Sequence, residues 1–133
     1  MLDTNTASYV IKGISQAARQ RLTSLSSESV VCISSITEGE LWFGLERIKA
    51  NEARRASLRS FLGRLRVLTW GREEAAVYGA FRARRESAGK TLGPLDTQIA
   101  AHSIAAGAIL VTHDSAFRNA IELGGLEDWA TDL

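Results

Sequence analysis

The sequence of 133 residues has one cysteine, one proline and no long apolar segment. A single thiol, at Cys32, cannot form an internal disulfide, and its apolar surroundings predict a small buried hydrophobic residue. The two histidines, His102 and His113, are far apart, which excludes a structural zinc site of cysteine and histidine. No apolar run approaches the ~18 residues of a membrane-spanning helix, and the N-terminus lacks the pattern of a signal peptide. The sequence therefore predicts a cytoplasmic protein with no membrane partner.

Hydrophobic residues make up 45% of the chain and charged residues 23%, which excludes a disordered or low-complexity protein. The length suits one domain, which we expect to span residues 1–133. The overall net charge is +1, but residues 47–90 hold twelve of the sixteen basic residues and carry a local charge of +8. Most of these residues are arginines, which suit phosphate recognition, so this segment indicates a polyanionic or acidic partner.

Short apolar runs alternate with segments of helical periodicity. The runs expected to form buried, mostly parallel strands are residues 1–2, 30–33, 67–70 and 108–111, with 126–129 as a candidate edge strand. The expected helices span residues 36–50, 54–65, 73–87, 94–106 before a stop at Gly107, and 115–123. Ser35 and Glu38 have the spacing of a capping box at the start of the first of these helices. This alternation predicts an α/β fold with a mostly parallel central sheet flanked by helices.

Three of the five aspartates follow strands or begin a helix, where ligands bind in parallel sheets. Asp3 follows the first strand, Asp114 follows strand 108–111, and Asp96 lies in the first turn of the helix that Pro94 begins. Glu40 lies near the start of the helix after the second strand, so four acids are expected to converge on one pocket. Converging carboxylates repel one another, and a divalent metal ion is the economical explanation.

The aspartates and Glu38 also have purely structural explanations. Asp96 would gain roughly 0.3–1 kcal/mol from the helix dipole, and Asp114 would cap a turn. Taken singly, these structural roles are favoured for both residues. Glu38 would return to Ser35 in the capping box, whereas Glu40 has no such task. His102 is expected to be packed or solvated, and His113 to approach a phosphate only as the less favoured alternative.

Four blocks together resemble the successive motifs of PIN-domain ribonucleases, and most closely those of the VapC toxins of bacterial toxin–antitoxin pairs. The blocks are residues 2–5 (LDTN), 34–41 (SSITEGEL), 93–100 (GPLDTQIA) and 110–117 (LVTHDSAF), and the ending LEDW at 126–129 is also similar. The resemblance spans essentially the whole chain and implies a PIN-like, three-layer α/β/α fold. It implies that Asp3, Glu40, Asp96 and Asp114 bind metal, with Asn5 and Thr112 as supporting polar residues.

The resemblance also implies an activity and partners. The activity is hydrolysis of RNA phosphodiester bonds with Mg²⁺, for which Mn²⁺ would substitute, and tRNA is one candidate substrate. Such toxins are neutralised by a cognate VapB-like antitoxin, and a homodimer is expected. Within the basic segment, Arg82, Arg84 and Arg85 are the expected contacts to RNA phosphates.

Three alternatives belong to other functional classes. A haloacid-dehalogenase-like phosphatase needs a second Asp two residues after the first, where this chain has Asn5. A phosphate-receiver domain needs an acceptor Asp after a middle strand, and residues 70–72 are Trp-Gly-Arg. The third alternative is a non-catalytic PIN-like binding module whose acidic pocket docks a partner's basic tail.

Overall fold

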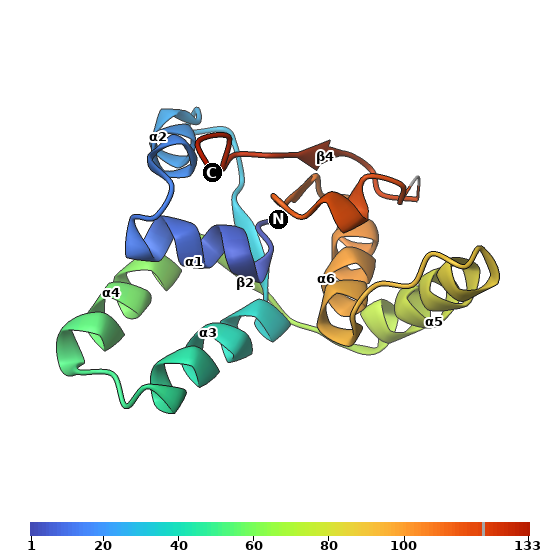
Figure 1. Cartoon of the computed structure of the whole chain (residues 1–133), viewed down its shortest axis with the longest axis horizontal. Coiled ribbons are helices and arrows are strands. Elements are labelled where there is room, and N and C mark those ends of the chain that lie inside the picture. Colours follow the sequence, from blue (N-terminus) through green and yellow to red (C-terminus); the bar gives the residue numbers. More distant parts are fainter. Residues whose placement is uncertain (121) are drawn as a thin grey trace.

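The computed structural model describes residues 1–120 and 122–133 of the chain. Short strands lie between two groups of helices, with α1, α3 and α4 to the left and α5 and α6 to the right in Figure 1. The helices are α1 (Thr4–Lys12), α2 (Gln16–Ser24), α3 (Ser35–Arg47), α4 (Glu52–Leu62), α5 (Arg72–Ser87), α6 (Pro94–Ala105) and the 3₁₀-helix η1 (Ser115–Phe117). The strands are β1 (Cys32–Ser34), β2 (Arg66–Leu68), β3 (Leu110–Val111) and β4 (Leu126–Glu127).

The strands form two parallel pairs, β1 with β2 and β3 with β4. Residues 1–3 join these pairs, because the Leu2 N–H donates to the Cys32 carbonyl at 2.9 Å and the Val111 N–H donates to the Met1 carbonyl at 2.8 Å. The spatial order is therefore β2, β1, residues 1–3, β3 and β4. This confirms the predicted parallel sheet, in which the first segment of the chain takes the central position.

Successive residues of the three inner strand segments belong to two different hydrophobic cores. Met1, Cys32 and Leu110 pack on the side of α5 and α6. Leu2, Ile33 and Val111 pack on the side of α1 and α4. Side chains alternate between the two faces of a strand, and here both faces are apolar, as in a parallel sheet that helices cover on both sides. The three-layer arrangement and the buried, free Cys32 were both predicted.

The start of α3 differs from the prediction. The last residue of β1, Ser34, caps the helix by accepting a hydrogen bond from the Ile36 N–H, because its backbone is still extended. Ser35 instead accepts a hydrogen bond from the Trp70 N–H, and Glu38 accepts one from the Trp42 indole. The capping box between Ser35 and Glu38 was therefore wrong. The end of α6, in contrast, is as predicted: Gly107 follows the helix with a φ of 60°.

The helix predicted over residues 115–123 was also wrong. Among the described residues of this range, only Ser115–Phe117 is helical, and it is a 3₁₀ turn. Beyond it, the Arg118, Ala120 and Leu123 N–H groups donate to carbonyls three residues earlier, which makes a series of turns instead of an α-helix. Residue 121, which the prediction included, lies outside the described residues. In the described part of the chain, no helix is long and apolar enough to cross a membrane.

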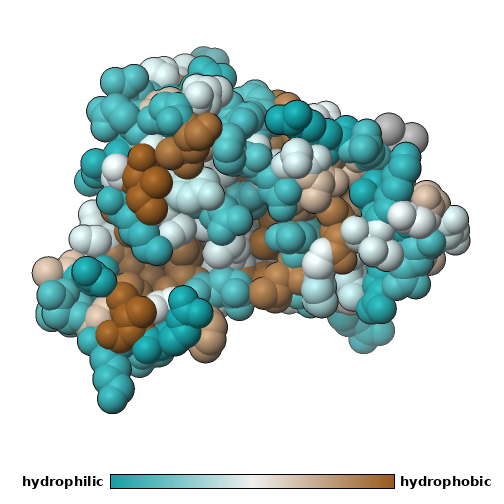
Figure 2. All heavy atoms as spheres, in the orientation of Figure 1, coloured by the Kyte–Doolittle hydropathy of each residue, from teal (hydrophilic) through white to brown (hydrophobic). Residues whose placement is uncertain are grey.

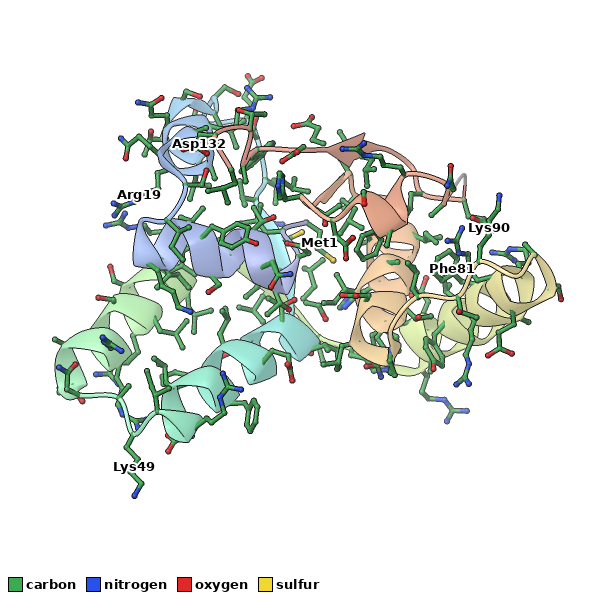
Figure 3. All side chains as sticks on the ribbon, viewed as in Figure 1. Met1, Arg19, Lys49, Phe81, Lys90 and Asp132 are labelled. Atoms are coloured by element: carbon green, nitrogen blue, oxygen red, sulfur yellow. The ribbon has the colours of Figure 1, made fainter. Side chains whose placement is uncertain are left out.

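The C-terminus is held against the start of α2. The Asp132 carboxylate accepts hydrogen bonds from the Ser15 hydroxyl and from the N–H groups of Gln16 and Ala17. These donors, the Ser15 hydroxyl first, lower the pKa of Asp132 below its ordinary value. In Figure 3, Asp132 lies beside α2, and the last residues of the chain thus cap a helix that begins far away in the sequence.

This cap gives a prediction about acid stability. A carboxylate with a lowered pKa stabilises the fold above the unfolded-state pKa of about 4, and this contribution disappears as the pH falls through the lower folded-state pKa. Asp132→Asn should therefore lower the melting temperature at neutral pH, and the difference from wild type should vanish in acid. Thermal melts from about pH 2 to about pH 7 measure this, with the exposed Glu28→Gln as control. A difference that does not change with pH would contradict the assignment.

Candidate functional site

Asp3 occupies the carboxyl end of the central strand segment and is only 3% exposed. Its backbone N–H donates to the Val111 carbonyl at 3.0 Å, which holds it in the sheet. Its side chain caps α1 by accepting a hydrogen bond from the Thr6 N–H at 2.7 Å. Burial raises the pKa of the Asp3 carboxyl, and hydrogen bonds from Thr112 and Thr6 offset part of the rise.

Thr112 links Asp3 to Asp114 at the end of β3. Its hydroxyl donates to the Asp3 carboxylate, which lowers the pKa of Asp3. The same hydroxyl accepts a hydrogen bond from the Asp114 N–H at 3.0 Å. Asp114 is exposed and caps η1 through the Ala116 N–H, and its negative charge contributes to the raised pKa of Asp3. The two aspartates and the threonine therefore form one connected group.

Asp96 is the third aspartate near this group. It lies in the first turn of α6, which begins at Pro94 and has no side-chain cap because its N-cap residue is Gly93. Burial raises the pKa of Asp96, and the negative charges of Asp114 and Asp3 raise it further. The charges of these three aspartates, which come from separate chain segments, therefore act on one another. Their role as metal ligands stays a prediction.

Glu40 and Asn5 lie in an adjoining cavity. This cavity has a volume of about 200 Å³ and is lined by residues of α1 and α3 that include Thr4, Asn5, Ser8, Lys12, Glu40 and Arg47. We call it the α1–α3 groove. Within the described ranges, no three acidic, histidine or cysteine side chains are already placed to hold one metal ion. The convergence of four acids on one metal ion therefore stays a prediction: the charges of the three aspartates act on one another, and Glu40 lines the adjoining groove.

The predicted arginine contacts do not share one environment. Arg82 is exposed and pairs with Glu86 at 2.8 Å, and Arg84 pairs with Glu122 at 3.6 Å. Arg85 is only 5% exposed and donates to the Asn119 carbonyl at 3.0 Å. The prediction that Arg85 contacts RNA was therefore wrong in this structure, because its side chain packs between α5 and the loop after η1.

Both histidines have protein partners. His102 is 1% exposed and its Nδ1 lies 2.8 Å from the Ser34 hydroxyl, so it is packed, as predicted. Burial lowers the pKa of His102. His113 Nδ1 lies 2.9 Å from the Asp128 carboxylate. His113, the sequence neighbour of Asp114, therefore pairs with Asp128.

Two supporting residues of the site were missed. Thr6 donates its N–H to Asp3, and Thr4 donates its hydroxyl to Thr37 of α3 at 3.3 Å. The spacing of Asp3 and Thr6 is that of an N-cap residue and its donor, so a capping analysis of residues 3–6 would have found the first contact. The second links α1 to α3 and depends on how the helices pack.

Comparisons with known proteins agree with this geometry. A family model described as PIN domain matches residues 1–123. The tRNA(fMet)-specific endonuclease VapC of Shigella flexneri is 35% identical, over 98% of this chain and 97% of its own. The VapBC2 structure from Rickettsia felis, bound to a promoter DNA fragment, has a TM-score of 0.90 and 33% identity, with 97% of both chains covered. This chain belongs to the VapC-type PIN-domain ribonucleases.

A second VapC-type structure has the same fold. The DNA-bound VapBC from Salmonella typhimurium has a TM-score of 0.87 and 36% identity, over 97% of this chain and 96% of its own. Membership of this family confirms the resemblance in the four sequence blocks and rules out the phosphatase and receiver alternatives. Nucleases of this kind generally depend on a divalent metal ion. The donor set fits such an ion, because hard carboxylate oxygens are its preferred ligands and two of the three aspartates have raised pKa values that a cation would lower.

Proposed function

We propose that this VapC-type protein is an endoribonuclease toxin that cleaves tRNA in the cytoplasm with bound Mg²⁺, for which Mn²⁺ substitutes. Asp3, Asp96 and Asp114 hold the ion, and Glu40 joins them from α3. The observation that supports this proposal is the Thr112 hydroxyl, which connects Asp3 and Asp114 at the end of β3, with Asp96 close enough for the charges of both aspartates to act on it. We further propose that residues 1–133 act as one domain.

The residues of this chain have defined tasks in the reaction. Asp3, Asp96, Asp114 and Glu40 would hold a divalent ion, which would supply Lewis-acid activation of the phosphate and of the attacking water. Thr6 and Thr112 fix the Asp3 carboxylate by donating hydrogen bonds to it, so that its oxygens keep one orientation. Asn5, exposed on the first turn of α1, offers an amide to the substrate. His102 and His113 have other partners, Ser34 and Asp128, so the tasks assigned here belong to the carboxylates and to the groups that orient them.

The substrate proposal is tested with purified protein and two transcripts. Initiator tRNA and an elongator tRNA of similar length are incubated with Mg²⁺ or with EDTA, and the 5′ ends of the products are sequenced. We expect cleavage at one position of the initiator tRNA, only with the metal ion. Uniform degradation of both RNAs would contradict the proposed substrate. Metal-independent binding without cleavage would favour the alternative of a non-catalytic module that docks a basic tail.

A partner prediction follows from the same acidic group. We propose a homodimer that binds a small VapB-like antitoxin, whose arginine enters among the carboxylates because a guanidinium can replace the missing cation. Co-expression with the neighbouring gene should give a stable complex without ribonuclease activity, and replacing that arginine by Ala should restore cleavage. Analytical ultracentrifugation measures the dimer. A monomer at micromolar concentration that the neighbouring product neither binds nor inhibits would contradict both parts.

A further inference from the structure

A buried hydrogen bond joins the helix that carries Asp96 to the start of the helix that carries Glu40. His102 lies on α6, six residues after Asp96, and its Nδ1 is 2.8 Å from the Ser34 hydroxyl. Ser34 is the N-cap residue of α3, and Glu40 lies six residues after it. His102 is 1% exposed and Ser34 is fully buried. The bond therefore connects the two helices that hold two of the four proposed metal ligands.

The Ser34 hydroxyl is the donor in this bond. It accepts a hydrogen bond from the Ile36 N–H at 3.0 Å, which leaves its own proton for the histidine ring. Burial lowers the pKa of His102, so the ring is neutral and its Nδ1 can accept that proton. The hydrogen-bond network thus assigns the remaining ring proton to Nε2. A neutral bond suits this place, because a buried charge without a partner would be costly.

A second contact holds the next residue of the chain. The Ser35 hydroxyl accepts a hydrogen bond from the Trp70 N–H at 3.1 Å. The Trp70 ring meets the His102 ring edge to face, with 5.7 Å between the ring centres and 80° between the ring planes. Two successive serines at the start of α3 are therefore tied to α6, one directly and one through Trp70.

These hydrogen bonds are directional, whereas the packing around them is apolar. Ile36 and Trp70 pack on the core that contains Ile99 of α6. In Figure 2, hydrophobic residues are visible between the two groups of helices. Apolar contacts do not depend on direction, but a hydrogen bond weakens steeply when its angle changes. Because a helix turns about 100° per residue, hydrogen bonds at its first residues set the direction of every later side chain.

We propose that His102 is a positioning residue: through Ser34 it fixes the rotation of α3 on α6 and so directs Glu40 toward the three aspartates. This inference rests on the proposed function, in which Glu40 joins the aspartates at the metal ion. His102 acts here through another residue and touches no reacting atom. Loss of a group that orients metal ligands typically costs about 10-fold to about 100-fold in metal affinity or activity.

The main test is His102→Phe, which keeps a ring beside Trp70 and removes the nitrogen that accepts from Ser34. We expect the Kd for Mn²⁺, measured by calorimetry without RNA, to rise about tenfold or more. The Mn²⁺ concentration that gives half of the maximal cleavage rate should rise by the same factor, with KM for tRNA within about twofold of wild type. In a Glu40→Gln background, His102→Phe should have no further effect on the Kd, because both changes act on one ligand.

Ser34→Ala removes the same bond from its other side and decides the question if His102→Phe does not fold. It should also raise the Kd for Mn²⁺ about tenfold or more, and the double variant should be no worse than Ser34→Ala alone. The matched control is Ser15→Ala, because Ser15 is also a fully buried N-cap serine, at the start of α2. Ser15→Ala should lower the melting temperature and keep the Mn²⁺ affinity. Within α6, Ile99→Val should do the same.

The ring proton of His102 gives a readout that does not depend on activity. The chain has two histidines, so His113→Gln identifies the His102 signals in ¹⁵N spectra of the imidazole rings. At neutral pH we expect the Nε2–H tautomer in wild type and a mixture of tautomers in Ser34→Ala. An Nδ1–H tautomer or an imidazolium in wild type would overturn the link to Ser34.

The outcomes separate this inference from the proposed function. If wild type neither binds Mn²⁺ nor cleaves RNA, the proposed function fails and this inference fails with it. If wild type does both and His102→Phe keeps the wild-type Kd, the bond from Thr4 to Thr37 is enough to hold α3, and this inference fails alone. A further rise of the Kd in the Glu40→Gln background would also overturn it, since His102 would then act on other groups. An equal rise in Ser15→Ala would do so too, because the effect would then come from lost stability.

Discussion

An Asp96→Asn variant is expected to lose RNA cleavage and toxicity while it keeps its fold. Asn has nearly the size of Asp but lacks the negative charge that a divalent cation requires. The loss should be at least about 100-fold in kcat, since metal-site positioning supplies much of the rate. Cleavage of labelled tRNA in Mg²⁺ measures it.

The stability of the same variant distinguishes a metal ligand from a helix-start residue. If Asp96 interacted only with the dipole of α6, replacing it would lower the free energy of unfolding by at most about 1 kcal/mol. A loss of that size does not unfold a domain. Burial raises the pKa of Asp96, and the charges of Asp114 and Asp3 raise it further, so the negative charge of Asp96 is unfavourable where it lies. In EDTA, the variant should therefore melt at the wild-type temperature or above it. Added Mg²⁺ should stabilise wild type more than the variant.

Asp132→Asn is the matched control for this experiment. It makes the same chemical change at a carboxylate that caps α2 and whose pKa is set by donors of that helix start, not by the three aspartates. We expect it to lose stability and keep cleavage, whereas Asp96→Asn should lose cleavage and keep stability. If Asp96→Asn cleaves tRNA at the wild-type rate, Asp96 only starts a helix and the metal site is wrongly assigned.

The sheet could be predicted because its sequence signal is local. Runs such as residues 30–33 and 108–111 are apolar at every position, which is typical of strands that are covered on both faces. The strands themselves are shorter, Cys32–Ser34 and Leu110–Val111, and Val30 and Ile109 outside them are exposed. The same pattern does not show which residue pairs with which. The central place of residues 1–3, between β1 and β3, comes from hydrogen bonds to partners far along the chain.

The sequence predicts which chain positions form the site, but not how their side chains are arranged in space. Asp3, Asp96 and Asp114 each follow a strand or begin a helix, and these positions meet at one edge of a parallel sheet. Whether Glu40 joins them depends on the rotation of α3 about its axis. That rotation is set by packing contacts and by Ser34, which caps the helix one residue earlier than predicted.

Arg85 shows that charge in the sequence does not predict which basic side chains are exposed. Three arginines within four residues look alike in the sequence, and each is expected to be solvated or to bind phosphate. On a helix, however, residues 82, 84 and 85 face different directions. The face of α5 that packs against the rest of the molecule includes Phe81 and Arg85, and the long aliphatic part of Arg85 is buried there.

Phe81 provides the prediction with the largest effect on stability. It is fully buried in the core between α5 and α6, where Figure 3 shows it pointing inward from α5. Phe81→Ala removes a large side chain and leaves a cavity, which typically lowers the free energy of unfolding by about 3–5 kcal/mol. Small domains have about 5–15 kcal/mol in total, so much of this protein's stability would be lost. Urea unfolding measures the change.

The exposed Phe43 is the control for this substitution. It is 57% exposed, so Phe43→Ala should change the free energy of unfolding by no more than about 0.5 kcal/mol. Because α6 packs on α5 and also carries Asp96, the Phe81→Ala variant should lose activity in proportion to its unfolded fraction, and lower temperature should restore it. Equal stability losses at the two positions would show that the core between α5 and α6 does not hold the acidic site in place.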